Sequence, residues 1–336
     1  MNVRYLSGFS GSFGMLLLGA DEADDVLFTD GRYDVRAAQE APGLPRHIGG
    51  KLAGQVAARV GTAFSGRALA VETHVLTVDE FGLFTSALRG VELVPAGRTL
   101  EKSRVVKDDA ELASLRRACS LSTAALQALL SSGRQVGRTE REIARDLENR
   151  MLDLGAEDIA FPTIVAAGPN AAIPHHQPTD RAVSAGDLLK IDFGATVDGY
   201  HADCTRTFVA GQPASWQVEI HSAVQRAQAA GVAACSDGVA IADVDSAARS
   251  VIADAGYAEA FTHGLGHGVG LEIHEDPFLS AISADRLTLR TPVTVEPGIY
   301  LRDRGGVRIE DTVVVSGPGS PENLTAGLST DLVSID

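Results

Sequence analysis

A glycine-rich stretch, HGLGHGVGLEIHE at residues 263–275, holds three of the nine histidines of the chain. His263, His267 and His274 are close enough in sequence to suggest a metal site. The stretch is not the helical HExxH zinc-binding motif, because it lacks the glutamate and its glycines disfavour a helix. A lone histidine here is also compatible with a structural role. Further ligands must therefore come from other segments of the chain.

Two aspartates lie on a predicted hairpin. Asp-Gly at 198–199 is a strong signal for a two-residue turn between the strands LLKIDFGATV and GYHADCTRTFV. This turn sets a register in which Asp192 faces Thr205. Side chains alternate along a strand, so Asp192 and Asp203 become diagonal neighbours on one face, about 7–8 Å apart. That spacing leaves room for a cation between the two carboxylates.

Two glutamates lie on a second predicted hairpin, formed by TPVTVEPGIYLR and GGVRIEDTVVV. The connecting loop is centred near residues 303–305, so Glu296 and Glu310 are also predicted to be near-diagonal neighbours. A carboxylate among valines and isoleucines is costly to bury unless it is paired. Any one of these acids could simply face solvent, but four of them, two on each hairpin, favour a cation site.

The types of ligand narrow the metal. Four carboxylates and one histidine suit hard or borderline divalent ions such as Mn²⁺, Co²⁺ or Zn²⁺. Carboxylates that can be shared between ions suit a two-metal site a few ångströms across. On this basis one histidine of the 263–275 stretch completes the ligand set.

The elements that position these groups form two predicted domains. In residues 1–103, short strands at GMLLLG, VLFTDGRY, ALAVE and VELVP alternate with helices at KLAGQVAARVGTAF and DEFGLFTSALRG, which indicates a small α/β domain. In residues 104–336, a pair of helices followed by a hairpin occurs twice. The first pair covers about 107–130 and 139–154, with a Thr139/Glu142 capping box, and the second covers about 215–234 and 243–255. The fold class predicted for the whole chain is α+β.

Composition excludes several classes of partner. The chain carries 44 acidic and 29 basic residues, a net charge of −15, and no Lys/Arg-rich run. These features argue against nucleic acid and anionic membrane surfaces as partners. The three cysteines are scattered, and the N-terminus has neither a signal-peptide pattern nor a membrane span. A reducing cytoplasm is the expected location.

Taken in order and spacing, four motifs resemble the pita-bread metallopeptidases. They are IDFGATVDGYHADCTRTF, HGLGHGVGLEIH, TVEPGIY and GGVRIED, and among these enzymes they most resemble the Xaa-Pro peptidases, prolidase and aminopeptidase P. YLSGFSGS and LFTDGRY resemble the creatinase-type N-terminal domain. The resemblance implies such a domain over 1–103 and a pita-bread catalytic domain with a pseudo-twofold repeat over 104–336. Domains of the first type usually begin some residues before a YLSGF motif, so this chain is expected to be shortened there.

The resemblance also implies roles for particular residues. The five metal-ligand positions are Asp192, Asp203, His267, Glu296 and Glu310. Two divalent ions are implied, with Mn²⁺ expected first and Co²⁺ or Zn²⁺ as alternatives. Asp203 and Glu310 would bridge the ions, and His267 would bind one.

Catalytic roles follow from the same resemblance. A hydroxide activated by both ions would attack the carbonyl of the Xaa-Pro bond, His274 would stabilise the oxyanion, and Glu296 would relay the proton to the leaving nitrogen. His175 and His263 fall on substrate-pocket positions. His176 and His201 have no such role.

The choice between dipeptides and longer peptides stays open at this stage. A dipeptidase needs a cation for the free carboxylate of its substrate, and arginine is the natural choice. Arg308 is one candidate, and Arg46, in the loop expected at APGLPRH, is another, with Arg32 and Arg36 as alternatives to Arg46. A solvated role for Arg46 is equally compatible. Prolidase is the favoured prediction. Aminopeptidase P and a non-catalytic binding protein on the same scaffold are the alternatives, and the resemblance implies a homodimer formed through the N-terminal domain.

Overall fold

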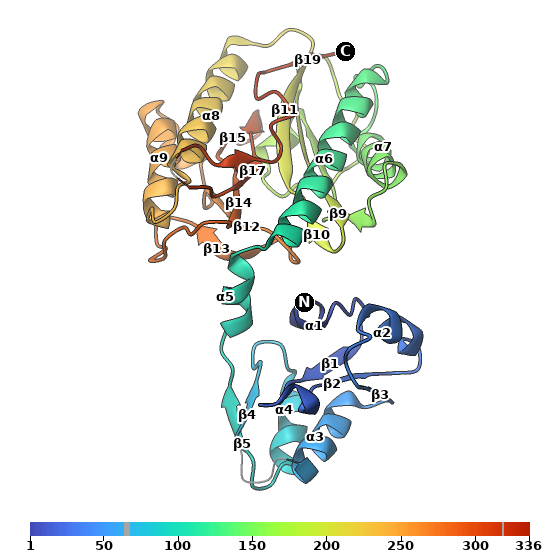
Figure 1. Ribbon diagram of the computed structural model, residues 1–336. Helices are drawn as coiled ribbons and strands as arrows, with labels where there is room; N and C mark the ends of the chain where they lie inside the picture. Colours follow the sequence, from blue (N-terminus) through green and yellow to red (C-terminus); the bar gives the residue numbers. More distant parts are fainter. Residues whose placement is uncertain (64–67, 318) are drawn as a thin grey trace. The chain divides into compact units, whose positions relative to one another are not determined.

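The computed structural model describes residues 1–63, 68–317 and 319–336. The chain divides into two compact units, Met1–Arg104 and Val105–Asp336 (Figure 1). Among the helices of the described residues, none has the length and apolar content needed to cross a membrane.

Two small sheets form the scaffold of the N-terminal unit. β1 (Gly14–Leu17) pairs antiparallel with β2 (Val26–Thr29), and β2 pairs parallel with β3 (Arg46–Ile48). β4 (Ala68–Val71) and β5 (Glu92–Pro95) form a separate parallel pair. The helical segments described here are η1 (Glu22–Asp24), α1 (Asn2–Ser7), α2 (Asp34–Glu40), α3 (Leu52–Ala63), α4 (Val78–Ala87) and α5 (Thr99–Val105).

The sequence predicted the periodic elements of this unit and missed the short ones. All four predicted strands are present, but the strand predicted over VLFTDGRY ends at Thr29, and Tyr33 is already the N-cap of α2. The helix predicted over residues 51–64 is α3, with position 64 outside the described residues. α1, α2 and β3 span only three to seven residues, too few for a periodic pattern to emerge.

The first half of the C-terminal unit pairs two helices with a mixed sheet, in which β19 runs parallel to β11 and the other pairs are antiparallel. α6 (Asp109–Ser131) and α7 (Glu140–Asp153) pack on each other, and α7 begins at the predicted capping box. The sheet has the order β19-β11-β8-β7, and its strands are β7 (Ile164–Ala167), β8 (Leu188–Phe193), β11 (Cys204–Ala210) and β19 (Ser334–Ile335). In the β8–β11 pair Thr205 lies opposite Asp192, so the register predicted from the turn is confirmed.

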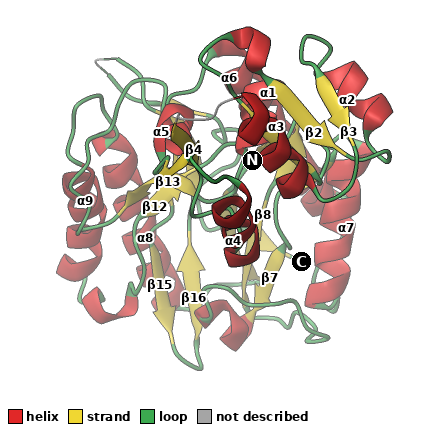
Figure 2. Ribbon diagram, turned by 90° about the horizontal axis from the view of Figure 1, so that it is seen from below, coloured by secondary structure: helices red, strands yellow, loops and turns green. Residues whose placement is uncertain are grey.

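The second half repeats this plan. α8 (Ser215–Ala234) and α9 (Ile241–Asp254) precede a sheet of order β13-β12-β14-β17-β18. Its strands are β12 (Gly266–Gly268), β13 (Glu275–Leu279), β14 (Pro292–Val295), β17 (Asp311–Val314) and β18 (Glu322–Asn323). Figure 2 shows α8 and α9 on one flank of the strands and α7 on the other. The helix-pair-and-hairpin repeat expected from the sequence is therefore present in the molecule.

Short strands and turns complete the C-terminal unit. β9 (Ala195–Val197) pairs with β10 (Tyr200–His201) and with β6 (Asp158–Ile159), and β15 (Gly298–Leu301) pairs with β16 (Gly305–Arg308). The 3₁₀ segments are η2 (Gly168–Ala172) and η3 (Ala258–Ala260). Each of the four long strands predicted for the two hairpins is thus divided into two short strands.

Candidate active site

Three of the four predicted ligand carboxylates lie where a strand is interrupted. Asp203 lies between β10 and β11, Glu296 between β14 and β15, and Glu310 between β16 and β17. At these breaks the backbone turns to new partners: the Glu310 amide donates to the Thr205 carbonyl at 3.1 Å, and the Glu296 amide donates to the Leu265 carbonyl at 2.8 Å. The breaks let strands of both halves converge on one point.

The predicted arrangement of the two glutamates is wrong in one respect. Val295 lies opposite Asp311 at the end of β14, and the same register continues into β15 and β16. Glu296 and Glu310 therefore face each other directly and are not diagonal neighbours. The prediction failed because the loop is centred on Asp303, which takes a positive φ of 59°, at the edge of the range assumed from sequence.

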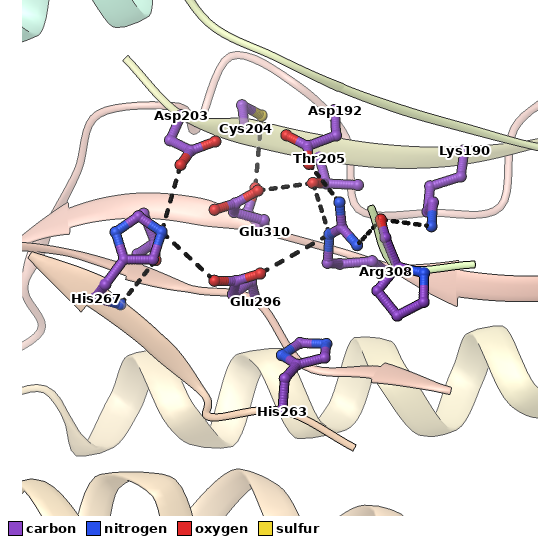
Figure 3. A network of polar contacts seen from close by, with 12 residues as sticks. Lys190, Asp192, Asp203, Cys204, Thr205, His263, His267, Glu296, Arg308 and Glu310 are labelled. Carbon is purple, nitrogen blue, oxygen red and sulfur yellow. Dashed lines mark hydrogen bonds and ion pairs between the residues drawn. The ribbon is translucent and has the colours of Figure 1, made fainter. Parts of the chain in front are cut away.

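The predicted metal-ligand residues do converge. Ligand atoms of Asp203, His267 and Glu310 all lie within 4.8 Å of one another. His267 Nε2 lies 3.5 Å from Asp203 Oδ2 and 3.6 Å from Glu296 Oε1. Figure 3 shows the side chains of Asp203, Glu310, Glu296 and His267 directed toward a common centre, with Asp192 beside them.

Burial and the mutual repulsion of the carboxylates at this centre favour the binding of a cation. Burial, reinforced by the neighbouring carboxylates, raises the pKa of Asp203 and of Glu310 well above the usual range. Burial also raises the pKa of Glu296 to about 8. Like charges gathered in a buried space disfavour ionisation of one another, and a bound cation reverses that effect.

The ring of His267 has the protonation state and the orientation that a metal ligand requires. Burial lowers the pKa of His267 to about 4, so the ring is neutral near pH 7. Its Nδ1 donates to the Gly268 carbonyl at 3.0 Å, and the lone pair of Nε2 therefore faces the carboxylates. Two ligand atoms 3.5 Å apart can share an ion at about 2.1 Å from each, the usual ligand distance for such ions.

Within the part of the chain that the structure describes, Asp192 has an unpaired carboxylate oxygen, which also indicates a bound cation at this centre. One carboxylate oxygen accepts a hydrogen bond from Arg308, and the other, Oδ1, is buried without a hydrogen-bond partner among the described residues. A buried acceptor left unpaired costs free energy that a bound ion would recover. The four carboxylates and His267 therefore fit a divalent metal centre.

A pocket of about 880 Å³ opens onto this centre. The residues expected to act on substrate line it together with the ligands. They are His175, His263, His274 and Arg308. Apolar side chains, including Phe161, Pro162, Ile273 and Phe278, form other parts of the wall. The structure thus brings together every predicted site residue of the C-terminal unit, and Arg46 belongs to the N-terminal unit.

His263 is fixed in a hydrogen-bonded chain. Its Nδ1 donates to the Gly264 carbonyl at 2.8 Å, so Nε2 accepts from the Tyr300 hydroxyl at 2.9 Å. Arg308 in turn donates to the Tyr300 oxygen at 3.0 Å. Burial lowers the pKa of His263 to about 4, which keeps the ring neutral.

His274 and His175 are more open to solvent. The His274 ring packs edge-on against His267, with ring centroids 4.4 Å apart. Burial, with a smaller effect of His175, lowers the pKa of His274. His175 is exposed in the pocket wall.

Arg308 is buried and largely occupied by the protein. Its guanidinium donates to Asp192, to the Thr205 hydroxyl at 3.0 Å, to the Tyr300 hydroxyl and to the Pro174 carbonyl at 3.2 Å. These contacts use four of the five N–H groups of an arginine. One N–H of Nη2 is left over for a substrate.

The prediction that Arg46 lies in a loop is wrong. It lies in strand β3 and not in a loop, because the backbone of residues 46–48 pairs with β2, Arg46 opposite Leu27. Its side chain forms an exposed ion pair with Asp34 at 2.8 Å. A strand of three residues is too short to show the alternating pattern from which it could have been predicted.

Three residues of the site were missed, and the positions of two of them carried a signal. Thr205 donates to Glu310 at 2.7 Å, Tyr300 links His263 to Arg308, and Lys190 is fully buried beside this network. Lys190 precedes Asp192 by two residues and so shares its face of β8, and Tyr300 follows Glu296 by four. Period-two alternation applied to the neighbours of the carboxylates would have found both.

A second acid–histidine cluster lies in the N-terminal unit and is held by hydrogen bonds. Glu72, His74 and Glu101 offer ligand atoms within 4.8 Å of one another. The side-chain amide of Asn2 donates to both glutamates, and His74 bonds to Glu101 at 2.8 Å. These contacts link the acids through Asn2 and His74.

The fold and the ligand set together define a metallopeptidase. Residues 113–317 match Metallopeptidase family M24, and residues 1–106 match the Creatinase/Prolidase N-terminal domain. The chain belongs to metallopeptidase family M24, so the predicted family and the predicted fold class are confirmed.

Known relatives agree with this assignment. The uncharacterised peptidase YqhT of Bacillus subtilis is 37% identical over 321 residues, which cover 95% of this chain and 90% of YqhT. The solved structure of an Xaa-Pro dipeptidase from Bacillus anthracis is similar with a TM-score of 0.93 and 34% identity, covering 99% of this chain and 92% of that one. An X-Pro aminopeptidase from Thermotoga maritima is similar with a TM-score of 0.91 and 36% identity, covering 99% and 93%.

Proposed function

We propose that this metallopeptidase hydrolyses the peptide bond before proline, with Xaa-Pro dipeptides as its main substrates. The observation that carries the proposal is the convergence of Asp192, Asp203, His267, Glu296 and Glu310 at the base of a pocket of about 880 Å³. The relatives named for Xaa-Pro cleavage support the choice of bond.

These five residues would hold two divalent ions, Mn²⁺ first, with Co²⁺ and Zn²⁺ as alternatives. Such ions supply a Lewis acid for the scissile carbonyl and an activated water as nucleophile. The chain supplies the rest: four carboxylates fix the positions of the ions, and neutral His267 adds the nitrogen donor.

The surrounding side chains would bind and orient the peptide. His274 is placed to donate a hydrogen bond to the oxygen that becomes negative in the transition state. Glu296, whose pKa burial raises, is suited to carry a proton to the leaving proline nitrogen. His175, His263 and the remaining N–H of Arg308 face the peptide from the pocket wall.

A peptide-length series tests the preference for dipeptides. Hydrolysis rates for Xaa-Pro and Xaa-Pro-Yaa, measured with defined Mn²⁺, Co²⁺ and Zn²⁺, should favour the dipeptide. Aminopeptidase P activity is the second candidate, because the Thermotoga aminopeptidase is as similar in sequence as the Bacillus dipeptidase. Prompt cleavage of tripeptides would establish that alternative.

Two arginine variants test which guanidinium group binds the carboxylate of a dipeptide. Arg308→Lys should raise KM for Xaa-Pro, because lysine cannot reproduce the planar contacts of the guanidinium. Arg46→Ala tests the contribution of the N-terminal unit. An unchanged dipeptide preference in Arg46→Ala would remove Arg46 from the site.

A non-catalytic binding protein on the same scaffold is the remaining alternative. About two ions per chain and activity lost on chelation support the enzyme. A protein that binds no metal and cleaves neither peptide length would support the binding function.

We also propose a cytoplasmic homodimer formed through the N-terminal unit. The three cysteines are buried free thiols, as expected in a reducing compartment. Val75 and Val78 are 61% and 88% exposed, and a contact between copies of the chain through these two side chains would remove apolar surface from water. Light scattering of the wild type and of Val78→Asp tests the dimer, and cell fractionation tests the compartment.

A further inference from the structure

His175 lies on a segment, residues 168–179, that two buried ionisable side chains bind: Glu140 binds it on both sides of His175, and Lys190 binds the two residues directly before His175. The segment begins with η2 and returns to the start of α7, where the backbone of Arg141 donates to the Thr179 carbonyl at 3.2 Å. Apart from η2 it has no regular structure, so its conformation depends on contacts made by side chains.

Glu140 holds the two flanks of His175 from α7. Its side chain is fully buried, although it is an acid in the first turn of a helix. One oxygen accepts from the Ala167 amide at 2.7 Å and from the Asn170 amide group at 2.9 Å. The other accepts from His176 Nε2 at 2.8 Å, and from the backbone and hydroxyl of Thr179 at 2.8 and 2.6 Å.

The charge of Glu140 is stabilised by these contacts. Burial by itself would raise its pKa, but the hydrogen bonds from Thr179, Ala167, Asn170 and His176 outweigh burial, and the pKa is lowered. Four of the five hydrogen bonds come from the 168–179 segment, and the fifth comes from Ala167 at the end of β7. A segment held by four bonds to one buried carboxylate has few alternative arrangements.

Lys190 holds the other side of the segment from β8. Its Nζ donates to the Ile173 carbonyl at 2.7 Å and to the Pro174 carbonyl at 3.2 Å, directly before His175. The side chain is fully buried and lies over the Tyr300 ring, 5.1 Å from its centroid, and burial lowers the pKa of Lys190 well below its usual range. Figure 3 shows the Lys190 amine next to Arg308, which binds the same Pro174 carbonyl.

We propose that Glu140 and Lys190 are positioning residues for His175: together they fix the 168–179 segment so that the imidazole faces the substrate pocket. The inference rests on the proposed function for the role of His175, but not for the fixation of the segment. Neither residue touches the pocket itself, so each acts through the backbone that it binds.

Glu140→Gln tests the proposal with volume preserved. Glutamine replaces one acceptor oxygen by a donor, so two or three of the five hydrogen bonds are lost. Glu142→Gln is the matched control, because Glu142 lies in the same turn, is exposed, and caps the helix without touching 168–179. Hydrogen exchange of metal-free protein should accelerate at the Ala167 and Thr179 amides in Glu140→Gln alone.

A double-mutant cycle then separates positioning from general stability. Glu140→Gln should lower kcat/KM about 10²-fold, the scale of a misplaced active-site group. In a His175→Ala background the same change should cost little more, because the group being positioned is gone. An equal loss in both backgrounds, or unchanged exchange at the two amides, overturns the proposal.

Two further variants keep the test decisive if Glu140→Gln does not fold. Thr179→Val removes one hydrogen bond to Glu140, and Lys190→Met removes both bonds to the carbonyls before His175. Each should act only when His175 is present, with bound metal unchanged. Faster exchange in Glu140→Gln, together with a wild type that cleaves no Xaa-Pro peptide, would reject the proposed function but not the fixation. An active wild type whose activity and exchange these variants leave unchanged would reject the fixation but not the proposed function.

Discussion

The Nε2 atom of His267 faces two carboxylate oxygens at 3.5 and 3.6 Å, an approach that a shared cation makes favourable. The same holds for Asp203 and Glu310, whose pKa values are raised because they are buried together. At the scale of single residues, burying these carboxylates together costs free energy without a metal ion, and a bound ion offsets that cost.

Asp203→Asn should reduce metal affinity by more than about 10²-fold, because even changes outside the ligand set cost 10- to 100-fold. The neutral amide removes a charge from the point where Asp203, His267 and Glu310 meet. Elemental analysis after dialysis measures the bound metal. Asp198→Asn, in the exposed hairpin turn, is the control, and equal metal content in both variants would contradict the assignment.

His274→Gln should lower kcat by about 10²–10³-fold, the usual cost of losing an oxyanion donor. KM for Xaa-Pro should change little, since the contact strengthens only in the transition state. Steady-state kinetics at saturating metal measures both constants. A rise in KM with kcat unchanged would instead make His274 a residue for ground-state binding.

At the scale of elements, close contact between backbones positions the ligands. A Cβ on Gly266 would lie 2.0 Å from the Thr294 carbonyl oxygen, and one on Gly194 would lie 1.8 Å from that of Ala202. These distances are impossible for real atoms, so β12 can approach β14 only with glycine. The glycines around His267 therefore serve the packing of strands.

Gly266→Ala should separate β12 from β14 and displace the neighbouring His267. We expect a loss of stability on the order of 1–3 kcal/mol, as for other overpacked sites, together with weaker metal binding. Gly327→Ala is the control, because a Cβ there meets Thr123 at an ordinary 3.7 Å. Chemical denaturation and metal titration measure the two effects, and identical behaviour of both variants would refute the packing argument.

His221 makes the stability of α8 depend on pH. Burial lowers its pKa to about 4, partly opposed by Asp331. The unfolded chain binds this proton near pH 6.5 but the folded chain does not, so stability is full above about 6.5 and falls as the pH drops toward 4. The loss of unfolding free energy when the pH falls from above 6.5 to below 4 is on the order of 3 kcal/mol.

Denaturation curves of the wild type and of His221→Gln at pH 7.5, 6, 5 and 4 isolate this effect. The difference in unfolding free energy between the two proteins should shift in favour of the variant as the pH falls. A difference that is constant over this range would show that the pKa of His221 is the same in the folded and the unfolded chain, and would contradict the prediction.

At the scale of the whole molecule, all five residues proposed as metal ligands lie in the Val105–Asp336 unit. Binding to the native state alone stabilises that unit by mass action, about 2.7 kcal/mol at a free metal concentration of 100 Kd. The relief of repulsion among buried carboxylates is the physical source of the gain.

Calorimetry of the full chain with excess Mn²⁺ and with chelator tests this coupling. We expect the transition assigned to the C-terminal unit to move to higher temperature with metal. Limited proteolysis followed by mass spectrometry identifies which unit melts in each transition. Identical melting of metal-loaded and chelated protein would mean that the acids do not form the metal centre.

Much of the architecture followed from local signals. The capping box at Thr139 and the Asp-Gly turn at 198–199 depend on neighbouring residues only, and both were predicted correctly. Elements such as β3 could not be predicted, because three residues carry no period and pairing with β2 decides their conformation. The breaks at Asp203, Glu296 and Glu310 were also missed, since they arise from hydrogen bonds between distant segments.

The sequence by itself determined the residue types, their order and the turns, and these were enough for the family and the ligand candidates. Only the tertiary structure decided that Glu296 and Glu310 face each other, that His267 presents Nε2 to the carboxylates, and that Glu140 and Lys190 hold the segment carrying His175. The physical reason is that local signals act over a few residues. Hydrogen bonds that join residues far apart in the chain are set when the whole unit packs.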